Sequence, residues 1–178
     1  EVNFEESDGK IGILTAEPLE RGFGLTLGNA IRRILLSSLQ GAAITSVKMK
    51  GVVHEFSTIP GVKEDLTDIL LNLKAVAVKV HSPGLKKMYL KSTGSGELRA
   101  GNFETDSETE IMNPDQIIMT LDSNADIEIE ANVETGKGYV TAEVAEDDEK
   151  VIGEIKLDAM FSPVIKTTYK VENSRVGQ

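Results

Sequence analysis

Residues 19–38, a glycine-punctuated segment that leads into a helical repeat of apolar side chains, constrain the fold more than any other part of the sequence. Apolar residues recur there at the i, i+3, i+4, i+7, i+8 spacing that makes one stripe along a helix. The members of the stripe are Leu27, Ala30, Ile31, Ile34 and Leu35. Thr26 is suited to cap this helix and Gly41 to follow its end, so the sequence predicts a helix over residues 27–39.

The opposite side of the same helix mixes polar and apolar side chains. At about 100° per residue, Leu36 projects away from Leu27. Its neighbours on that side are Asn29, Arg32 and Arg33. A surface helix normally carries only solvated groups there, so this mixture indicates a contact with another chain. A helix that packs on both sides within one domain is the alternative.

The charge balance of the chain argues against direct contact with nucleic acid. The 178 residues include 19 basic and 29 acidic side chains, a formal net charge of −10. Such a balance repels phosphate unless basic groups gather on one face, and the only adjacent basic pairs are Arg32-Arg33 and Lys86-Lys87. Aromatic residues make up 4% of the chain, too few for a platform that stacks bases. We expect no direct binding of nucleic acid by these residues.

Cysteine usage and hydropathy indicate where the protein acts. The chain has no cysteine, which removes disulfides and zinc–thiolate sites and is typical of a reducing compartment. Its aliphatic runs are far shorter than the roughly 20 residues that cross a bilayer, and its first residues do not resemble a basic secretory leader. We expect a soluble cytoplasmic protein with no membrane partner, and a plastid stroma as the alternative location.

Beyond the long helix, the apolar period changes and predicts a chain of both helices and strands. A strand is predicted over residues 11–16 and a second helix over residues 62–73, where Leu and Ile recur at helical spacing. Further apolar or alternating runs predict strands at 43–50, 52–56, 76–80, 87–91, 126–133, 155–159 and 164–171. Residues 52–56 could form a hairpin with 43–50 across Gly51. A change of composition near Gly41 suggests a domain boundary.

Four blocks of sequence stand in the order in which they occur in a known family. They are ERGFGLTLGNAIRRILLSS at 20–38, GVVHEFST at 51–58, GVKED followed by ILLNLK at 61–74, and FSPV with VENSRV at 161–176. Through these blocks the chain resembles the N-terminal assembly region of the alpha subunit of bacterial-type DNA-directed RNA polymerase. The resemblance covers nearly the whole chain. A scaffold of the same fold from an archaeal or eukaryotic enzyme is a less similar alternative.

The resemblance implies an α+β fold with mixed or antiparallel sheets and a long dimerisation helix. It also implies that a second, mostly β domain is inserted into the first. Residues 1–40 and 164–178 are then expected to form the dimerisation domain, and residues 41–163 the inserted domain. In the family, two alpha copies pair and recruit the beta and beta-prime subunits, which carry the chemistry of transcription.

The resemblance also implies which residues make the two kinds of contact. The stripe Leu27, Ala30, Ile31, Ile34 and Leu35 is expected to belong to the dimer side of the helix. The residues expected to meet beta or beta-prime are Arg21, Gly24, Asn29, Arg33, Leu36, His54, Glu55, Phe56, Ser57, Lys74 and Arg175. Family members continue past position 178 with a helix that packs on the partner copy, which leaves dimerisation of this chain alone open. Their domain that touches DNA and activators also lies beyond it.

Glycines 22, 24 and 28 leave one ligand-binding alternative open. Their spacing is GxGxxxG rather than the dinucleotide pattern GxGxxG, and no P-loop Lys-Ser/Thr follows. The structural explanation is that these glycines permit positive φ and the close approach of another backbone, which the resemblance identifies as the beta subunit. A small-molecule-binding α/β domain that uses residues 22–28 is the alternative function.

No arrangement of residues predicts catalysis, a cofactor or a metal site. The two histidines, His54 and His81, have no spacing that places both on one metal. Ser37 and Ser38 lack the elbow of a serine nucleophile, and the acidic run at 143–149 lacks the ligand spacing of a calcium loop. No Asp-x-Asp-x-Asp cluster is present to hold the two magnesium ions of an RNA-polymerising site.

Overall fold

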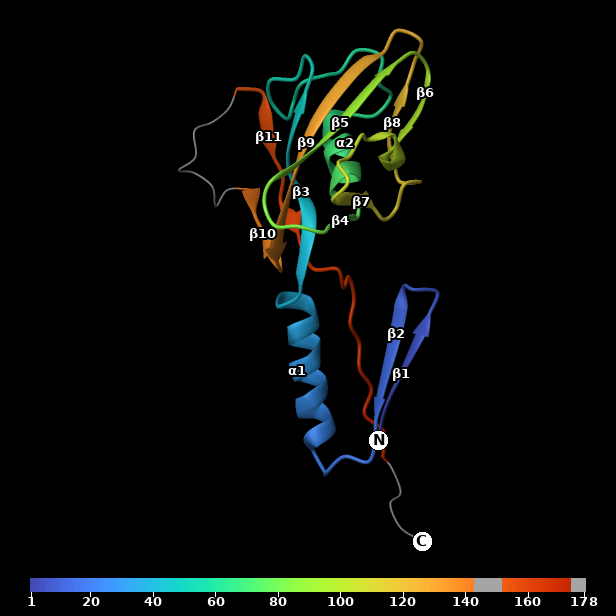
Figure 1. The fold of residues 1–178 in the computed structure, drawn as a ribbon, viewed down its shortest axis with the longest axis vertical. Helices are drawn as coiled ribbons and strands as arrows, with labels where there is room; N and C mark the ends of the chain where they lie inside the picture. The colour runs from blue at the N-terminus through green and yellow to red at the C-terminus, as the bar shows by residue number, and fades with distance from the viewer. Residues whose placement is uncertain (143–151, 174–178) are drawn as a thin grey trace. The chain divides into compact units, whose positions relative to one another are not determined.

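The computed structural model describes residues 1–142 and 152–173, which form two compact units. Unit 1 comprises Glu1–Leu36 and Val164–Gln178, and unit 2 comprises Ser37–Pro163. Figure 1 shows the elements of each unit. The assignment of these parts to a dimerisation domain and an inserted domain stays a prediction. Among the described residues, no helix is long and apolar enough to span a bilayer.

Unit 1 begins with a two-stranded antiparallel hairpin. Strand β1 (Val2–Ser7) pairs with β2 (Ile11–Ala16), so that Val2 lies opposite Ala16. The chain reverses through Asp8 and Gly9, both with positive φ, as the primed turns of hairpins require. The strand predicted at 11–16 is β2, whereas β1 was not predicted, although the Asp-Gly pair was a hairpin signal.

Helix α1 (Phe23–Ser37) follows the hairpin and belongs to unit 1 except for its last residue. The predicted range of 27–39 is wrong at both ends. The chain turns at Gly22, the only one of the three glycines with positive φ, and the helix begins at the next residue. Thr26 therefore lies inside the helix instead of capping it.

Residues 164–173 run extended alongside α1 and form no strand (Figure 1). The strand predicted at 164–171 is wrong, because among the described residues no other strand pairs with this segment. Its side chains pack on the helix instead. A Cβ at Gly28 would lie 2.5 Å from Cδ2 of Tyr169, and one at Gly24 would lie 3.1 Å from Cγ1 of Val171. These helix glycines thus admit side chains of the same chain, where we expected the backbone of another.

Unit 2 is built on an antiparallel sheet in the order β5-β9-β3-β4-β7, with β11 also paired to β3. The elements are β3 (Gln40–Met49), α2 (Leu66–Lys74), β4 (Val78–Val80), β5 (Lys86–Thr93), β6 (Gly96–Arg99), a 3-10 turn (Ala100–Asn102), β7 (Thr109–Ile111), β8 (Ile117–Leu121), β9 (Asp126–Lys137), β10 (Tyr139–Val140), β11 (Glu154–Lys156) and β12 (Ala159–Met160). Strands β6 and β8 form one further pair, and β10 and β12 another. The predicted α+β class with mostly antiparallel sheets is confirmed.

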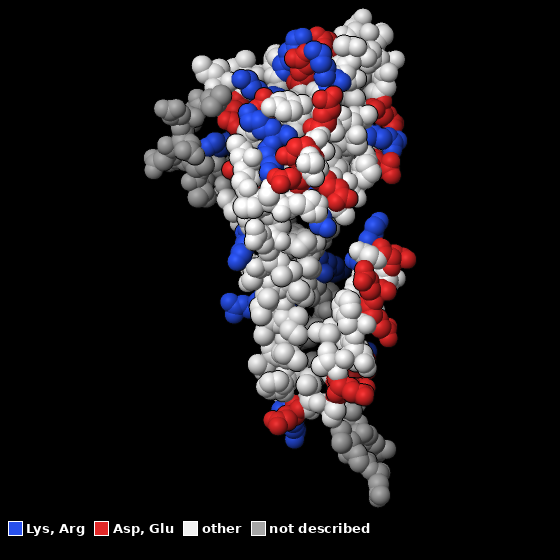
Figure 2. All heavy atoms as spheres, viewed as in Figure 1, with Lys and Arg blue, Asp and Glu red and all other residues white. Residues whose placement is uncertain are grey.

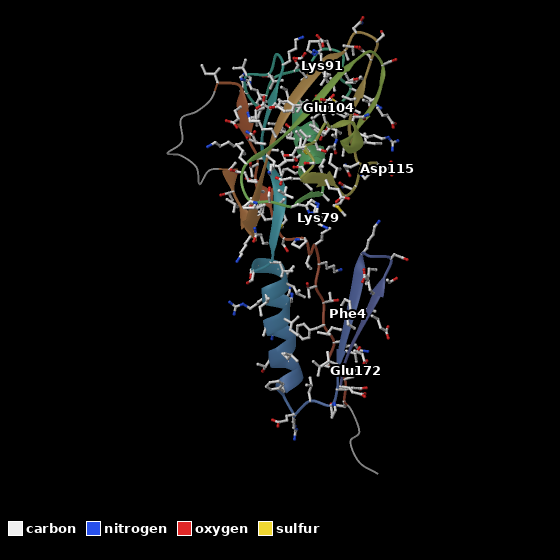
Figure 3. All side chains as sticks on the ribbon, in the orientation of Figure 1. Phe4, Lys79, Lys91, Glu104, Asp115 and Glu172 are labelled. Atoms are coloured by element: carbon white, nitrogen blue, oxygen red, sulfur yellow. The ribbon has the colours of Figure 1, made fainter. Side chains whose placement is uncertain are left out.

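Strand β9 shows how sequence alternation builds the core of unit 2. Ile127, Ile129, Ala131 and Val133 are buried on one face, where the apolar side of α2 contributes Leu66, Ile69, Leu70 and Leu73 to the same cluster. The intervening β9 residues are polar and lie on the other face. There Glu128 pairs with Lys91 and Glu130 with Lys87, each at 2.5 Å. Figure 2 shows both signs of charge interspersed over unit 2, and Figure 3 labels Lys91.

Two local predictions in unit 2 are wrong for the same reason: they depend on which strand edges are already paired. Residues 52–56 form no hairpin with β3, because β9 lies on one side of β3 and β11 occupies the other at Lys48. Helix α2 begins at Leu66 rather than at residue 62, because residues 61–63 pair with β8. Lys63 N–H donates to the Thr120 carbonyl at 3.0 Å, and Asp122 N–H donates to the Gly61 carbonyl at 2.9 Å.

Gly61 is a position of unit 2 where both the backbone conformation and the surrounding space exclude a side chain. Its φ is +80°, and a Cβ would lie 2.9 Å from backbone atoms of Ala125. We predict that Gly61→Ala lowers the free energy of unfolding by about 2 to 4 kcal/mol, from left-handed strain plus overpacking. Urea unfolding followed by circular dichroism measures this loss. Gly51→Ala is the matched control, because its φ is +78° and nothing lies within 4 Å. Equal losses in the two variants would contradict the packing argument.

Candidate functional site

The described residues do not gather the ligands of a metal centre. Within residues 1–142 and 152–173, no three His, Cys, Asp or Glu side chains could hold a metal ion together. A cavity of about 320 Å³ lies where residues 61–63 pair with β8, and its charged lining residues are Lys63 and Asp122. Gly24 and Gly28 lie inside α1, so residues 22–28 do not form the glycine loop that a small-molecule site would use. The candidate sites are therefore surfaces.

Unit 1 exposes apolar side chains and has no core of its own. None of its described residues is buried. Val2 and Phe4 on the hairpin are 70% and 66% exposed, and Phe4 is labelled in Figure 3. An isolated two-stranded hairpin is marginally stable at best, and large exposed apolar patches mark interaction sites. Unit 1 thus has the exposed apolar surface that is typical of an interaction site.

The apolar stripe predicted on α1 divides between two sides of the helix. Ile31 and Leu35 are half-buried and share the side of Gly24 and Gly28, where residues 169–171 pack. Leu27 is half-buried, whereas Ala30 and Ile34 are exposed. Together with the exposed Phe23, these three make an i, i+4, i+7, i+11 row that we call the outer row: Phe23, Leu27, Ala30 and Ile34. The outer row lies beside the packed glycines on the helix surface, and Phe23 was not predicted as part of it.

The residues in and just before α1 that were predicted to meet beta or beta-prime have different surroundings. Arg21 and Arg33 are exposed, and Leu36 is half-buried. Gly24 is covered by Val171, and Asn29 accepts a hydrogen bond on Oδ1 from the Tyr169 hydroxyl at 2.9 Å. The last two residues therefore have a role within the chain, and the external contacts of all five stay predictions.

His54, Glu55, Phe56 and Ser57 lie together in a tight turn, residues 53–57, at the surface of unit 2. The Ser57 hydroxyl oxygen accepts from the N–H groups of Val53 and His54, at 3.4 and 3.3 Å. Ser57 N–H donates to the His54 carbonyl at 3.0 Å, and Phe56 N–H donates to Nδ1 of His54 at 3.3 Å. The turn is thus closed by its own side chains, and Phe56 is 80% exposed.

A carboxylate anchors the segment that follows this turn. Glu64 accepts the Thr120 N–H at 2.7 Å and the Thr120 hydroxyl at 2.8 Å. Burial raises the pKa of Glu64, but the hydrogen bonds from Thr120, one from its own backbone and the nearby charge of Lys63 together lower the pKa below its ordinary value of 4.5. Glu64 and Gly61 were quoted in a sequence block but not predicted to have a role.

Lys74, at the end of α2, is held by a network inside unit 2. Its Nζ donates to Oδ2 of Asp158 at 3.3 Å, and the Tyr139 hydroxyl donates to the same oxygen at 2.8 Å. Ala142 N–H donates to Oδ1 of Asp158 at 2.9 Å. The hydrogen bond from Ala142, followed by those from Tyr139 and Lys74, lowers the pKa of the Asp158 carboxyl. Arg175 and the acidic run at 143–149 lie outside the described residues.

One comparison with known proteins bears on these surfaces. A family model described as the RNA polymerase Rpb3/RpoA insert domain matches residues 47–162 of this chain, well over half of its length. The match includes the turn 53–57, the Glu64 anchor, α2 with Lys74, and strands β4 to β12. It ends before residues 164–173 and begins after α1.

The Glu64 anchor predicts a pH-dependent contribution to stability. Because folding lowers the pKa of Glu64, its contribution is present above about pH 4.5 and is lost as the pH falls through the folded pKa. Glu64→Gln removes one acceptor, so we expect the free energy of unfolding at pH 7 to fall by about 1 to 2 kcal/mol. The gap between variant and wild type should narrow below pH 4.5. Urea titrations at several pH values measure it, with Glu55→Gln as the exposed control; a gap independent of pH would contradict the assignment.

Proposed function

Because this chain belongs to the RNA polymerase Rpb3/RpoA insert-domain family and is an alpha-type subunit of RNA polymerase, we propose that it is a non-catalytic assembly platform. Two copies pair through unit 1, and the pair recruits the beta and beta-prime subunits of the bacterial-type enzyme. The proposal assigns no catalytic step, cofactor or direct nucleic-acid contact to this chain. It places the protein with the transcription machinery in the cytoplasm, or in a plastid stroma.

The absence of a buried side chain in the described part of unit 1 is the observation that carries the proposal. Apolar burial supplies most of the favourable free energy of folding, at about 25 cal/mol per Å². A helix and a hairpin that bury none of their large side chains lack that contribution until another surface covers them. The face of α1 seen in Figure 2 carries a broad uncharged area, as the centre of an interface does.

The outer row is assigned to the second alpha copy, in place of the whole predicted stripe. Ile34 is 55% exposed and its row lies beside the side that residues 169–171 cover. A symmetric pair places the same row of both copies against each other, which is the commonest arrangement of homodimers. The opposite side of α1, with Leu25, Arg33 and Leu36, is then left for a large subunit.

A charged side chain introduced into the outer row tests this assignment. We predict that Ile34→Glu raises the dimer dissociation constant at least about thirtyfold, because a carboxylate must then be desolvated in an apolar contact. Analytical ultracentrifugation of the full chain over a range of concentrations measures the constant. Leu25→Glu is the matched control, since Leu25 is 57% exposed and lies on the opposite side of the helix, so it should dimerise as wild type does.

The pair of variants separates the two interfaces. Leu25→Glu should still be fully dimeric. Its affinity for purified beta subunit should fall, because that side of α1 is the one assigned to a large subunit. Loss of dimerisation in both variants would contradict the assignment of the two sides. A wild-type chain that binds neither a second copy nor beta would contradict the proposed function itself.

A further inference from the structure

The turn between β1 and β2 holds an unusual backbone conformation at an exposed position. Among the described residues, Asp8 is the only residue other than glycine with positive φ, at +55°, and Gly9 follows it at +64°. Lys10 N–H donates to the Ser7 carbonyl at 3.1 Å and closes the turn. All four residues are exposed. The conformation at Asp8 carries a steric cost that aspartate tolerates better than most side chains do.

The same two residues form a chemically reactive pair. Asp8-Gly9 is the only Asp-Gly pair in the 178 residues, and the chain has no Asn-Gly pair. The nitrogen of the residue after an aspartate can attack the side-chain carboxyl carbon and close a five-membered succinimide ring. A Cβ on that following residue hinders the attack, and glycine has none. A Cβ at Gly9 would meet Oε1 of Glu6 only at 3.8 Å, so the surroundings leave the nitrogen open as well.

The closed turn opposes this reaction. A left-handed backbone at Asp8 sets the nitrogen of Gly9 nearly opposite to the Cβ of Asp8, whereas ring closure needs the two on the same side. Rotation about the Cα–C bond of Asp8 brings them together, and that rotation breaks the hydrogen bond from Lys10 to Ser7. The reaction therefore requires the turn to open first.

The hairpin has little to keep it closed. An isolated two-stranded hairpin is marginally stable at best, and none of the described residues of unit 1 is buried. Segments with few buried apolar contacts open locally at a small cost in free energy. The reactive conformation is thus within reach of the folded chain.

We propose that Asp8-Gly9 is a modification site, at which the opened hairpin isomerises to isoaspartate. The Gly9 nitrogen bonds to the carboxyl carbon of Asp8, and the proton of that nitrogen leaves with the carboxyl OH as water. Water then opens the ring. Attack at the side-chain carbonyl restores aspartate, and attack at the main-chain carbonyl links the chain through the side chain. Water is the only co-reactant, and the inference does not rest on the proposed function.

The product cannot rebuild the same hairpin. Isoaspartate adds one methylene to the main chain between Ser7 and Gly9, inside the turn. The pairing that sets Ser7 opposite Ile11 then no longer matches the length of the turn, and strand register depends on that length. Isomerisation therefore leaves a permanent record of chains whose hairpin has opened.

The test incubates the full chain at physiological pH and temperature and locates isoaspartate by electron-transfer mass spectrometry of its peptides. Labelling with an isoaspartyl methyltransferase counts the sites. We expect isoaspartate to form at Asp8 at least about tenfold faster than at Asp106 and Asp122, the aspartates that precede serine. The carboxylates of those two also accept backbone N–H groups in unit 2. A free peptide of residues 5–12 should react faster than the full chain, because it has no hairpin to open.

A variant away from the turn tests whether opening controls the rate. The Phe4 ring lies against Gly12 on the opposite strand, where a Cβ would come within 3.0 Å of it. Phe4→Ala removes this cross-strand contact, so isomerisation at Asp8 should become about threefold faster. Phe56→Ala is the matched control, because Phe56 is an exposed phenylalanine of unit 2 and its loss should leave the rate at Asp8 unchanged.

Three results would overturn the inference. Isoaspartate at Asp8 that forms no faster than at Asp106 would show that the pair is not a preferred site. A rate in the full chain equal to that of the free peptide would show that the hairpin gives no protection. A rate that Phe4→Ala leaves unchanged would show that the reaction does not pass through the opened hairpin.

Discussion

The antiparallel pairing of β3 with β9 is the interaction on which unit 2 depends. It runs from Gln40 opposite Lys137 to Met49 opposite Ile129, with one bulge between Ile44 and Ser46. This register sets Ile129, Ala131 and Val133 on the face that α2 covers, and a slip of one residue would exchange that face with the charged one. The turn 53–57 follows the end of β3, so the same pairing decides where this turn lies.

Unit 1 lacks any comparable interaction. The contacts among its described residues include a hairpin, a hydrogen bond from Tyr169 to Asn29, and side chains packed against two helix glycines. These contacts leave Phe23, Ala30 and Ile34 of the outer row exposed. The same sequence therefore builds one unit around an internal core and one whose apolar surface another chain is proposed to complete. Under the proposed function, unit 1 gains its missing apolar contacts when the subunits assemble.

Apolar periodicity within a segment predicted several helices and strands. It did not predict features whose bounds depend on pairing with a distant strand. Strand β2, much of α1 and α2, and strand β9 follow from periodicity within each segment. The start of α2 at Leu66 and the turn 53–57 depend on which edges of β3 and β8 are already paired, and no single segment carries that information. The roles of Gly24 and Asn29 depend on Tyr169 and Val171, more than a hundred residues away in the chain. The contact residues came from resemblance, since an exposed Phe56 has no periodic signal.

Amide hydrogen exchange of wild-type chain, measured by mass spectrometry at several protein concentrations, tests the central claim that unit 1 is completed by another chain. Amides of α1 should exchange quickly in dilute solution and become protected as the concentration rises, whereas amides of β9 should stay protected throughout. Protection of α1 that equals that of β9 at every concentration would contradict it, because unit 1 would then be stable without a partner.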